Sequence, residues 1–209
     1  MLMPQGTYTV LNGSLKLVDK DSLPRTTADP LWLTEHVNSF KDGETVGDIG
    51  SGIGTIALIL AQQNPTVKFI GYELDPILVE AACENAQLNT LTNCTFEVMD
   101  ILKHTPSLTF DHIVSNPPYH NTNKGFSSQN NSKQLAHGSS IEQTKQWLLI
   151  CLNLTKKGGS CTLMQHCHNL EYIEPLLTEH EYELTYIKTS PKRPAKRVII
   201  TIQISKKHP

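Results

Sequence analysis

Short apolar runs alternate with amphipathic stretches through the middle of this chain. Four runs have the length and composition of buried strands, over residues 46–49, 67–72, 95–99 and 112–115. Helical patterns lie over 55–63, before Asn64-Pro65, and from Asp75-Pro76 to about Leu88, where the aspartate suits an N-cap and the proline the first turn. Strands that alternate with helices predict an α/β protein with a parallel, doubly wound sheet.

The pattern changes in the second half of the chain. A helix is predicted over 141–154, a turn at Lys157-Gly158-Gly159, a strand over 160–165 and a helix near 170–179. Two strands, near 182–189 and 197–204, have no helix between them, so we expect them to pair antiparallel at one edge of the sheet. Residues 120–138 are polar and predict a long loop, which in a compact domain is usually functional.

Length and composition favour one folded domain. We expect residues 1–209 to form it, with residues 29–209 as the core and residues 1–28 as an extension that contains a hairpin around Asn12-Gly13. A chain with 38% hydrophobic and 18% charged residues is not typical of disorder, and no apolar run could span a bilayer. The N-terminal residues show no signal-peptide pattern, and the five cysteines are scattered. Both observations predict a cytoplasmic protein with reduced thiols and no membrane partner.

The charges are unevenly distributed, although the formal net charge is only −2. Residues 188–209 hold seven of the eighteen Lys and Arg residues and no acid, whereas the first 187 residues carry a balance of −9. Such asymmetry indicates an anionic partner or, alternatively, a solvated lysine-rich terminus.

A glycine-rich loop between the first core strand and its helix is the first chemical signal. It contains Asp48, Gly50, Ser51, Gly52 and Gly54. A dinucleotide-binding fold would carry Gly-x-Gly-x-x-Gly, which seats a pyrophosphate at the helix N-terminus. Here the glycines stand at every second position, and the acid before them would repel a pyrophosphate but suits an ammonium group. The spacing therefore disfavours a nicotinamide-dependent oxidoreductase.

Two further acids follow the next two strands. Glu73 can accept hydrogen bonds from ribose hydroxyls, and Asp100 can accept one from an adenine amino group. An amino-acid tail, a ribose and an adenine together describe S-adenosylmethionine. At this point the chain resembles the class I, Rossmann-like methyltransferases. The resemblance implies a seven-stranded, mostly parallel sheet with the last strand antiparallel and helices on both faces.

The tetrapeptide Asn116-Pro117-Pro118-Tyr119 follows the fourth core strand. The Asn116 side-chain oxygen and the Pro117 carbonyl can each accept one N–H of an NH₂ group, and the prolines fix the backbone that carries them. Tyr119 can stack on a planar base. The motif resembles that of methyltransferases acting on amino groups of adenine, guanine or protein glutamine, and tyrosine in the fourth position fits adenine or glutamine. We assign catalysis to these four residues and count Asn116 with the cofactor-binding residues as well.

The chain further resembles the tRNA1(Val) adenine-N6 methyltransferase group in four stretches. These are Asn12–Leu17, Thr27–Leu33, Leu135-Ala136-His137 and Pro194–Val198. It departs from the group by an alanine inserted before Asp29, by Ala136 in place of an arginine, and by His120 in place of an aromatic residue. The resemblance implies methylation of a tRNA adenine next to the anticodon.

An RNA substrate needs phosphate contacts near the acceptor pocket. Residues 112–141 contain no Asp or Glu, which favours RNA contact there and from the basic tail. The candidate RNA-binding residues are Lys124, Phe126, Lys133, His137, Lys192, Arg193, Lys196 and Arg197. No metal is predicted, because His166-Cys167-His168 has no second Cys/His pair nearby.

The most favoured function is therefore transfer of a methyl group from S-adenosylmethionine to the exocyclic amino group of adenine in RNA, with tRNA as the expected partner. Two alternatives remain open at this point. One is a protein glutamine N5-methyltransferase that uses the same tetrapeptide, and the other is a non-catalytic RNA-binding protein on a methyltransferase fold.

Overall fold

The computed structural model describes residues 6–117, 130–190 and 192–205, and within 130–140 only the course of the backbone. Its centre is a seven-stranded sheet in the order β5-β4-β3-β6-β7-β9-β8. All neighbouring strands are parallel except that β9 runs antiparallel to both β7 and β8. The strands are β3 (Thr45–Ile49), β4 (Lys68–Glu73), β5 (Cys94–Val98), β6 (Phe110–Ser115), β7 (Thr155–His166), β8 (Glu181–Ile187) and β9 (Arg197–Gln203).

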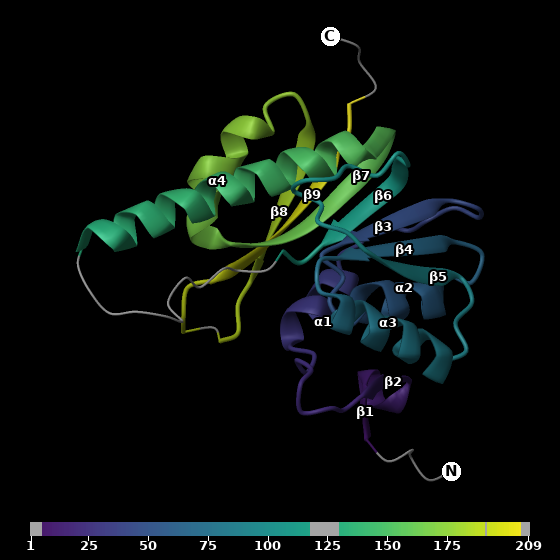
Figure 1. Ribbon diagram of the computed structural model, residues 1–209. Coiled ribbons are helices and arrows are strands. Elements are labelled where there is room, and N and C mark those ends of the chain that lie inside the picture. The colour runs from purple at the N-terminus through teal and green to yellow at the C-terminus, as the bar shows by residue number, and fades with distance from the viewer. Residues whose placement is uncertain (1–5, 118–129, 191, 206–209) are drawn as a thin grey trace.

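Helices cover both faces of the sheet (Figure 1). On one face lie α1 (Ala28–Thr34), α2 (Thr55–Gln63) and α3 (Pro76–Leu88), and on the other lie α4 (Asn130–Leu154) and α5 (Leu170–Ile173). Two short 3₁₀ helices, η2 (Cys167–Asn169) and η3 (Glu174–Leu176), flank α5. These features confirm the predicted Rossmann-like class I fold.

Each face of the sheet has its own apolar core. The core beneath α1, α2 and α3 includes Leu33, Phe69 and Val114, and the core beneath α4 includes Phe110 and Leu163. Residues 55–61 of α2 are all buried, and all but Thr55 are apolar, so this segment lies deep in its layer. Alternate residues of each central strand therefore bury apolar side chains in opposite directions, as a sheet covered on both faces requires.

The predicted N-terminal hairpin consists of β1 (Thr7–Val10) and β2 (Leu15–Val18), joined by η1 (Leu11–Gly13). It packs against α3, where the Asn85 side-chain oxygen accepts a hydrogen bond from the Val18 amide at 2.8 Å and that of Asn89 accepts one from the Lys16 amide at 2.9 Å. Asn85 and Leu17 are completely buried. The hairpin therefore completes the core rather than hanging free of it.

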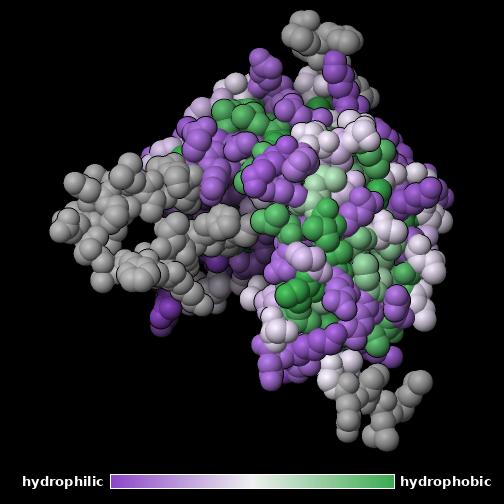
Figure 2. Space-filling model, in the orientation of Figure 1, coloured by the Kyte–Doolittle hydropathy of each residue, from purple (hydrophilic) through white to green (hydrophobic). Residues whose placement is uncertain are grey.

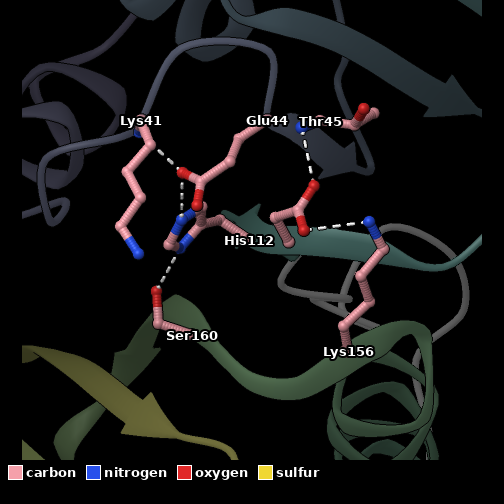
Figure 3. A network of polar contacts seen from close by, with 7 residues as sticks. Lys41, Glu44, Thr45, His112, Lys156 and Ser160 are labelled. Atoms are coloured by element: carbon pink, nitrogen blue, oxygen red, sulfur yellow. Dashed lines mark hydrogen bonds and ion pairs between the residues drawn. The ribbon is translucent and has the colours of Figure 1, made fainter.

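A polar network secures the edge of the sheet where β3 and β6 begin (Figure 3). The His112 ring lies 2.7 Å from the Ser160 hydroxyl through Nδ1 and 3.0 Å from the Glu44 carboxylate through Nε2. Asp111 accepts hydrogen bonds from the amide of the first residue of β3 and from Lys156, each at 2.9 Å. The network joins β3, β6 and β7 at the edge opposite to the strand ends that carry the predicted site.

Most predicted elements are confirmed, and three details were wrong. Residues 130–138 were predicted as part of a loop but belong to α4. Their sequence is polar and has no apolar stripe, so the helical pattern could not be detected. Residues 157–159 lie within β7 as an irregularity, with Gly158 at φ +81° and a register shift against β6 between Phe110 and His112. The helix predicted near 170–179 breaks after Ile173, because Pro175 cannot donate the backbone hydrogen bond of an α-helix.

The five cysteines all fall within the described part of the chain and are free thiols. In that part, no helix combines the length and the hydropathy that crossing a bilayer would need.

Candidate active site

The predicted cofactor residues and the first two residues of the acceptor motif lie at one edge of the sheet. Gly50, Glu73 and Asn116 lie at or immediately beyond the carboxyl ends of β3, β4 and β6, and Asp100 lies two residues beyond β5. After β3 the chain proceeds outward to β4 and β5, then returns to place β6 on the other side of β3. This is the topological switch point, where doubly wound sheets bind ligands.

The glycine loop turns tightly from β3 into α2. The amides of Gly50 and Ser51 both donate to the Tyr72 carbonyl, at 2.8 and 3.1 Å. Gly50, Gly52 and Gly54 have φ of +75°, +56° and +84°, a region that residues with a side chain rarely adopt. A Cβ at Gly54 would also lie 2.7 Å from the Phe96 ring. The loop conformation therefore depends on glycine at these positions.

Asp48 is completely buried beneath this loop. Its Oδ2 accepts a hydrogen bond from the Ala57 amide at 3.1 Å, whereas its Oδ1 has no partner among the residues that the structure describes. Burial raises the pKa of Asp48 to about 7, the Ala57 amide opposes this shift, and the charge of Glu73 adds to it. The buried Ser51 hydroxyl likewise has no partner in the described region. Two unpaired buried oxygens at the glycine loop fit a ligand that brings hydrogen-bond donors, such as an ammonium group.

Glu73 is held by the backbone around it. Its Oε2 accepts from the Gly52 amide at 2.9 Å, and its Oε1 accepts from the amides of Leu74 and Asp75 at 2.8 and 3.0 Å. Three of the roughly four acceptor positions of a carboxylate are thus in use, and one on Oε2 remains for a ligand hydroxyl. The same contacts tie the glycine loop to the end of β4.

Asp100 is partly buried beside its own short turn. Its Oδ1 accepts from the Leu102 amide at 3.2 Å, and its Oδ2 pairs with Lys103 at 2.9 Å. The hydrogen bond from Lys103 lowers the pKa of Asp100, so the group is a carboxylate and an acceptor at neutral pH.

Apolar side chains at this edge were missed by the sequence analysis. Leu74, Ile77 and Val98 have 62%, 55% and 54% of their surface exposed, and Val98 pairs with Glu73 in the sheet. Figure 2 shows apolar surface in the middle of the same view, near the meeting point of the strand ends and α3 in Figure 1. Such a surface beside the ribose-type acceptor Glu73 suits the flat face of a base. The signal in the sequence is an apolar residue directly after an acid that ends a strand.

The acceptor motif begins at the end of β6. Asn116 is half-buried, Pro117 is buried, and the preceding Ser115 is completely buried. Four predicted residues lie outside the described residues: Pro118, Tyr119, Lys124 and Phe126. Two more, Lys133 and His137, lie on the first turns of α4, where only the backbone is described.

Basic residues of the tail lie at the same edge of the sheet, but they differ in how far they are exposed. Lys192, Arg193 and Lys196 are exposed in the connection from β8 to β9. Arg197 is partly buried. Its Nε donates to Asp29 of α1 at 2.9 Å and one terminal nitrogen lies 2.8 Å from His166 Nδ1.

The His166 ring accepts this hydrogen bond. Burial and then the Arg197 cation lower the pKa of His166 to about 4, so the ring is neutral at physiological pH. The Arg197 guanidinium thus belongs to an intramolecular cluster with Asp29 and His166 that residue spacing did not reveal. Within the described ranges, no three His, Cys, Asp or Glu side chains are grouped as a metal site would need.

Comparison with known proteins places this chain in a family. A family model described as a methyltransferase domain matches residues 40–203. The tRNA1(Val) (adenine(37)-N6)-methyltransferase of Aliivibrio salmonicida is 29% identical over 173 residues, which covers 79% of this chain and 72% of the relative. The release factor glutamine methyltransferase of Aliivibrio fischeri is 33% identical over 106 residues, which covers 50% of this chain and 37% of the relative.

A solved structure supports the fold assignment. The crystal structure of a predicted O-methyltransferase from Agrobacterium tumefaciens matches with a TM-score of 0.67 at 19% identity, over 85% of this chain and 82% of that chain. At this identity the match concerns the fold alone. The chain therefore belongs to the methyltransferase domain family, with the class I Rossmann-like fold and S-adenosylmethionine as its cofactor.

Proposed function

We propose that this methyltransferase modifies the exocyclic amino group of an adenine in RNA. The observation that supports the proposal most directly is the position of Asn116 and Pro117, which follow β6 at the switch point and lie beside the strand that leads into the glycine loop. An acceptor for an NH₂ group thus adjoins the loop proposed to hold the methyl donor.

In the proposed mechanism, each residue of the candidate site that the structure describes has a role. Asp48, Gly50, Ser51, Gly52 and Gly54 hold the amino-acid portion of the cofactor, while Glu73 and Asp100 hold the ribose and adenine. When bound, the cofactor supplies an electrophilic methyl group on a sulfonium.

Asn116 Oδ1 and the Pro117 carbonyl accept the two N–H bonds of the substrate and orient the nitrogen lone pair toward that methyl group. Held by these residues, S-adenosylmethionine would supply the methyl group to the nitrogen that Asn116 and Pro117 orient, and the proton that this nitrogen then loses would pass to water.

A tRNA is the RNA that we propose as substrate, with the adenine next to the anticodon as its target. The name of the Aliivibrio salmonicida relative and the exposed cations Lys192, Arg193 and Lys196 at the same sheet edge support this choice. A tRNA substrate would place the enzyme in the cytoplasm.

The test is methyl transfer from radiolabelled S-adenosylmethionine to tRNA from a strain that lacks the enzyme. Wild type should yield N6-methyladenosine in nucleoside mass spectrometry, and Asn116→Ala should lose at least 100-fold in kcat, by the magnitude typical of a lost transition-state hydrogen bond. Asn64→Ala is the matched control, because Asn64 ends α2 at the opposite edge of the sheet. Undiminished transfer by Asn116→Ala would exclude the assigned role.

Protein glutamine methylation is the second candidate, since the match to a release factor glutamine methyltransferase covers half of this chain. Label that appears in a release factor and not in tRNA would favour it. Loss of both activities, together with no binding of S-adenosylmethionine by calorimetry, would instead favour a non-catalytic RNA-binding protein.

A further inference from the structure

A buried hydroxyl connects the two halves of the candidate site. The Ser115 Oγ donates a hydrogen bond to the Ile49 carbonyl at 2.6 Å and accepts one from Trp147 Nε1 at 3.0 Å. Ser115 directly precedes Asn116, and Ile49 directly precedes Gly50. The serine side chain therefore lies between the start of the acceptor motif and the start of the glycine loop.

The hydrogen bond from Ser115 lies just beyond the point where the backbone pairing between β3 and β6 ends. The last paired residues of these strands are Asp48 and Val114, although Ile49 still pairs with Tyr72 of β4 and Ser115 still pairs with Leu163 of β7. The strands β3 and β6 separate only at the switch point. The Ser115 side chain supplies a hydrogen bond there to a buried strand end.

The direction of this hydrogen-bond chain is unambiguous. An indole N–H can only donate and a carbonyl can only accept, so the serine must accept from Trp147 and donate to Ile49. With its single proton engaged, the hydroxyl is not a base or a nucleophile in the described arrangement. Its contribution is positional.

Trp147 brings a third element into the connection. It lies on α4, which begins at Asn130 and is the first element that the structure describes after the acceptor motif. Its ring is half-buried against the core beneath α4, and that core includes Ile49 and Leu148. The indole thus fixes α4 to the same point that separates the acceptor motif from the glycine loop.

We propose that Ser115 and Trp147 are positioning residues, which set the distance between the Asn116 and Pro117 acceptors and the methyl donor without touching either reactant. The proposal rests on methyl transfer at Asn116. Loss of this hydrogen-bond chain should misplace the acceptors relative to the methyl donor, and a displacement of about 1 Å can cost 100-fold in rate. Cofactor binding should be preserved, because the contacts of Asp48 and Glu73 do not involve Ser115.

The test compares Ser115→Ala and Trp147→Phe with wild type. We expect kcat to fall about 10- to 100-fold in each variant, while the Kd for S-adenosylmethionine changes less than about twofold. Because both variants break one chain, the double variant should be no slower than Ser115→Ala. Ser115→Thr keeps the hydroxyl and should recover most of the rate.

Thr155→Val is the matched control. Thr155 is buried, its hydroxyl donates to the Cys151 carbonyl at 2.8 Å, and it pairs with Phe110 at the opposite edge of the sheet. It should lower the melting temperature as Ser115→Ala does, yet leave kcat unchanged.

Normal kcat in Ser115→Ala or Trp147→Phe would overturn the proposal, as would an equal loss of kcat in Thr155→Val. If Ser115→Ala does not fold, Trp147→Phe decides the question alone, because the phenyl ring preserves most of the packing. Rates are measured with the acceptor, RNA or protein, to which the wild-type enzyme transfers the label. A protein acceptor would contradict the proposed RNA substrate, but the role of Ser115 would still be tested by the same variants.

Discussion

At the scale of single residues, the site combines a carboxylate buried away from water with another that its surroundings hold in place. Asp48 has one oxygen that accepts a hydrogen bond from Ala57 and one without a partner among the described residues, and Glu73 is held by three backbone amides. Burial raises the pKa of Asp48 to about 7. A cation that enters beside it would therefore interact with a group whose charge is sensitive to pH near neutrality.

We predict that the contribution of Asp48 to stability without ligand falls as pH rises from about 4 to about 7. In this window the folded protein keeps the Asp48 proton, because its pKa is raised from 3.8 to about 7, while the unfolded chain has released its own. The stabilisation is complete below the unfolded pKa and is lost as pH passes the folded one. The whole effect is on the order of 4 kcal/mol. Urea unfolding of wild type and Asp48→Asn across this pH range should show their difference in unfolding free energy change by this amount, because the lowered pKa of His166 gives both proteins the same opposing slope. A difference that does not vary with pH would contradict the prediction.

At the scale of elements, α1 is a short helix that buries little of its own surface. It has seven residues, and Leu33 is its one buried side chain. Asp29 in its first turn forms the ion pair with Arg197 at the start of β9, and the two side chains are 17% and 24% exposed. A partly buried pair that joins segments 168 residues apart is better placed to hold α1 than to meet a phosphate.

We predict that Asp29→Ala and Arg197→Ala lower stability by similar amounts, about 1–3 kcal/mol each, because each leaves the other charge without its partner. The double variant should cost less than the two losses added together. The dependence of RNA affinity on salt should stay unchanged in both variants. A salt slope that falls by about one in Arg197→Ala but not in Asp29→Ala would return Arg197 to the RNA-binding set.

Elements with local signals were predictable, and contacts between distant segments were not. The bounds of α2 follow from Gly54 before it and Asn64-Pro65 after it, and those of α3 from the Asp75 cap. The Ser115–Trp147 hydrogen bond and the ion pair of Arg197 with Asp29 have no local sequence pattern, because these side chains are far apart in the sequence and meet only in the folded protein. Acids at strand ends were found by spacing, but the apolar surface beside them was not.

At the scale of the whole molecule, the two edges of the sheet have different roles. The edge where β3 and β6 begin is closed by the network around His112, and the carboxyl edge collects the loops with the candidate site and the exposed cations of the tail. This division places the His112 network and the proposed RNA contacts on opposite sides.

We predict that the triple variant Lys192→Ala/Arg193→Ala/Lys196→Ala raises KM for tRNA and leaves the Kd for S-adenosylmethionine unchanged. If each cation neutralises one phosphate, the slope of log affinity against log salt should decrease by about 2 to 3. Binding measured at several salt concentrations tests this. The control is Lys41→Ala/Lys68→Ala, which removes exposed cations near the starts of β3 and β4. An equal effect in the control would mean that the tail has no special role.

The place of β9 inside the sheet has a consequence for synthesis on the ribosome. Strands β7 and β8 are made before β9, yet β9 lies between them and contributes Ile199, Ile200 and Ile202 to the buried interior. Until β9 emerges, both neighbours present unpaired edges, which invite pairing with other chains. A product truncated before residue 197 would keep the complete glycine loop and acceptor motif in its sequence, but it would be prone to aggregate.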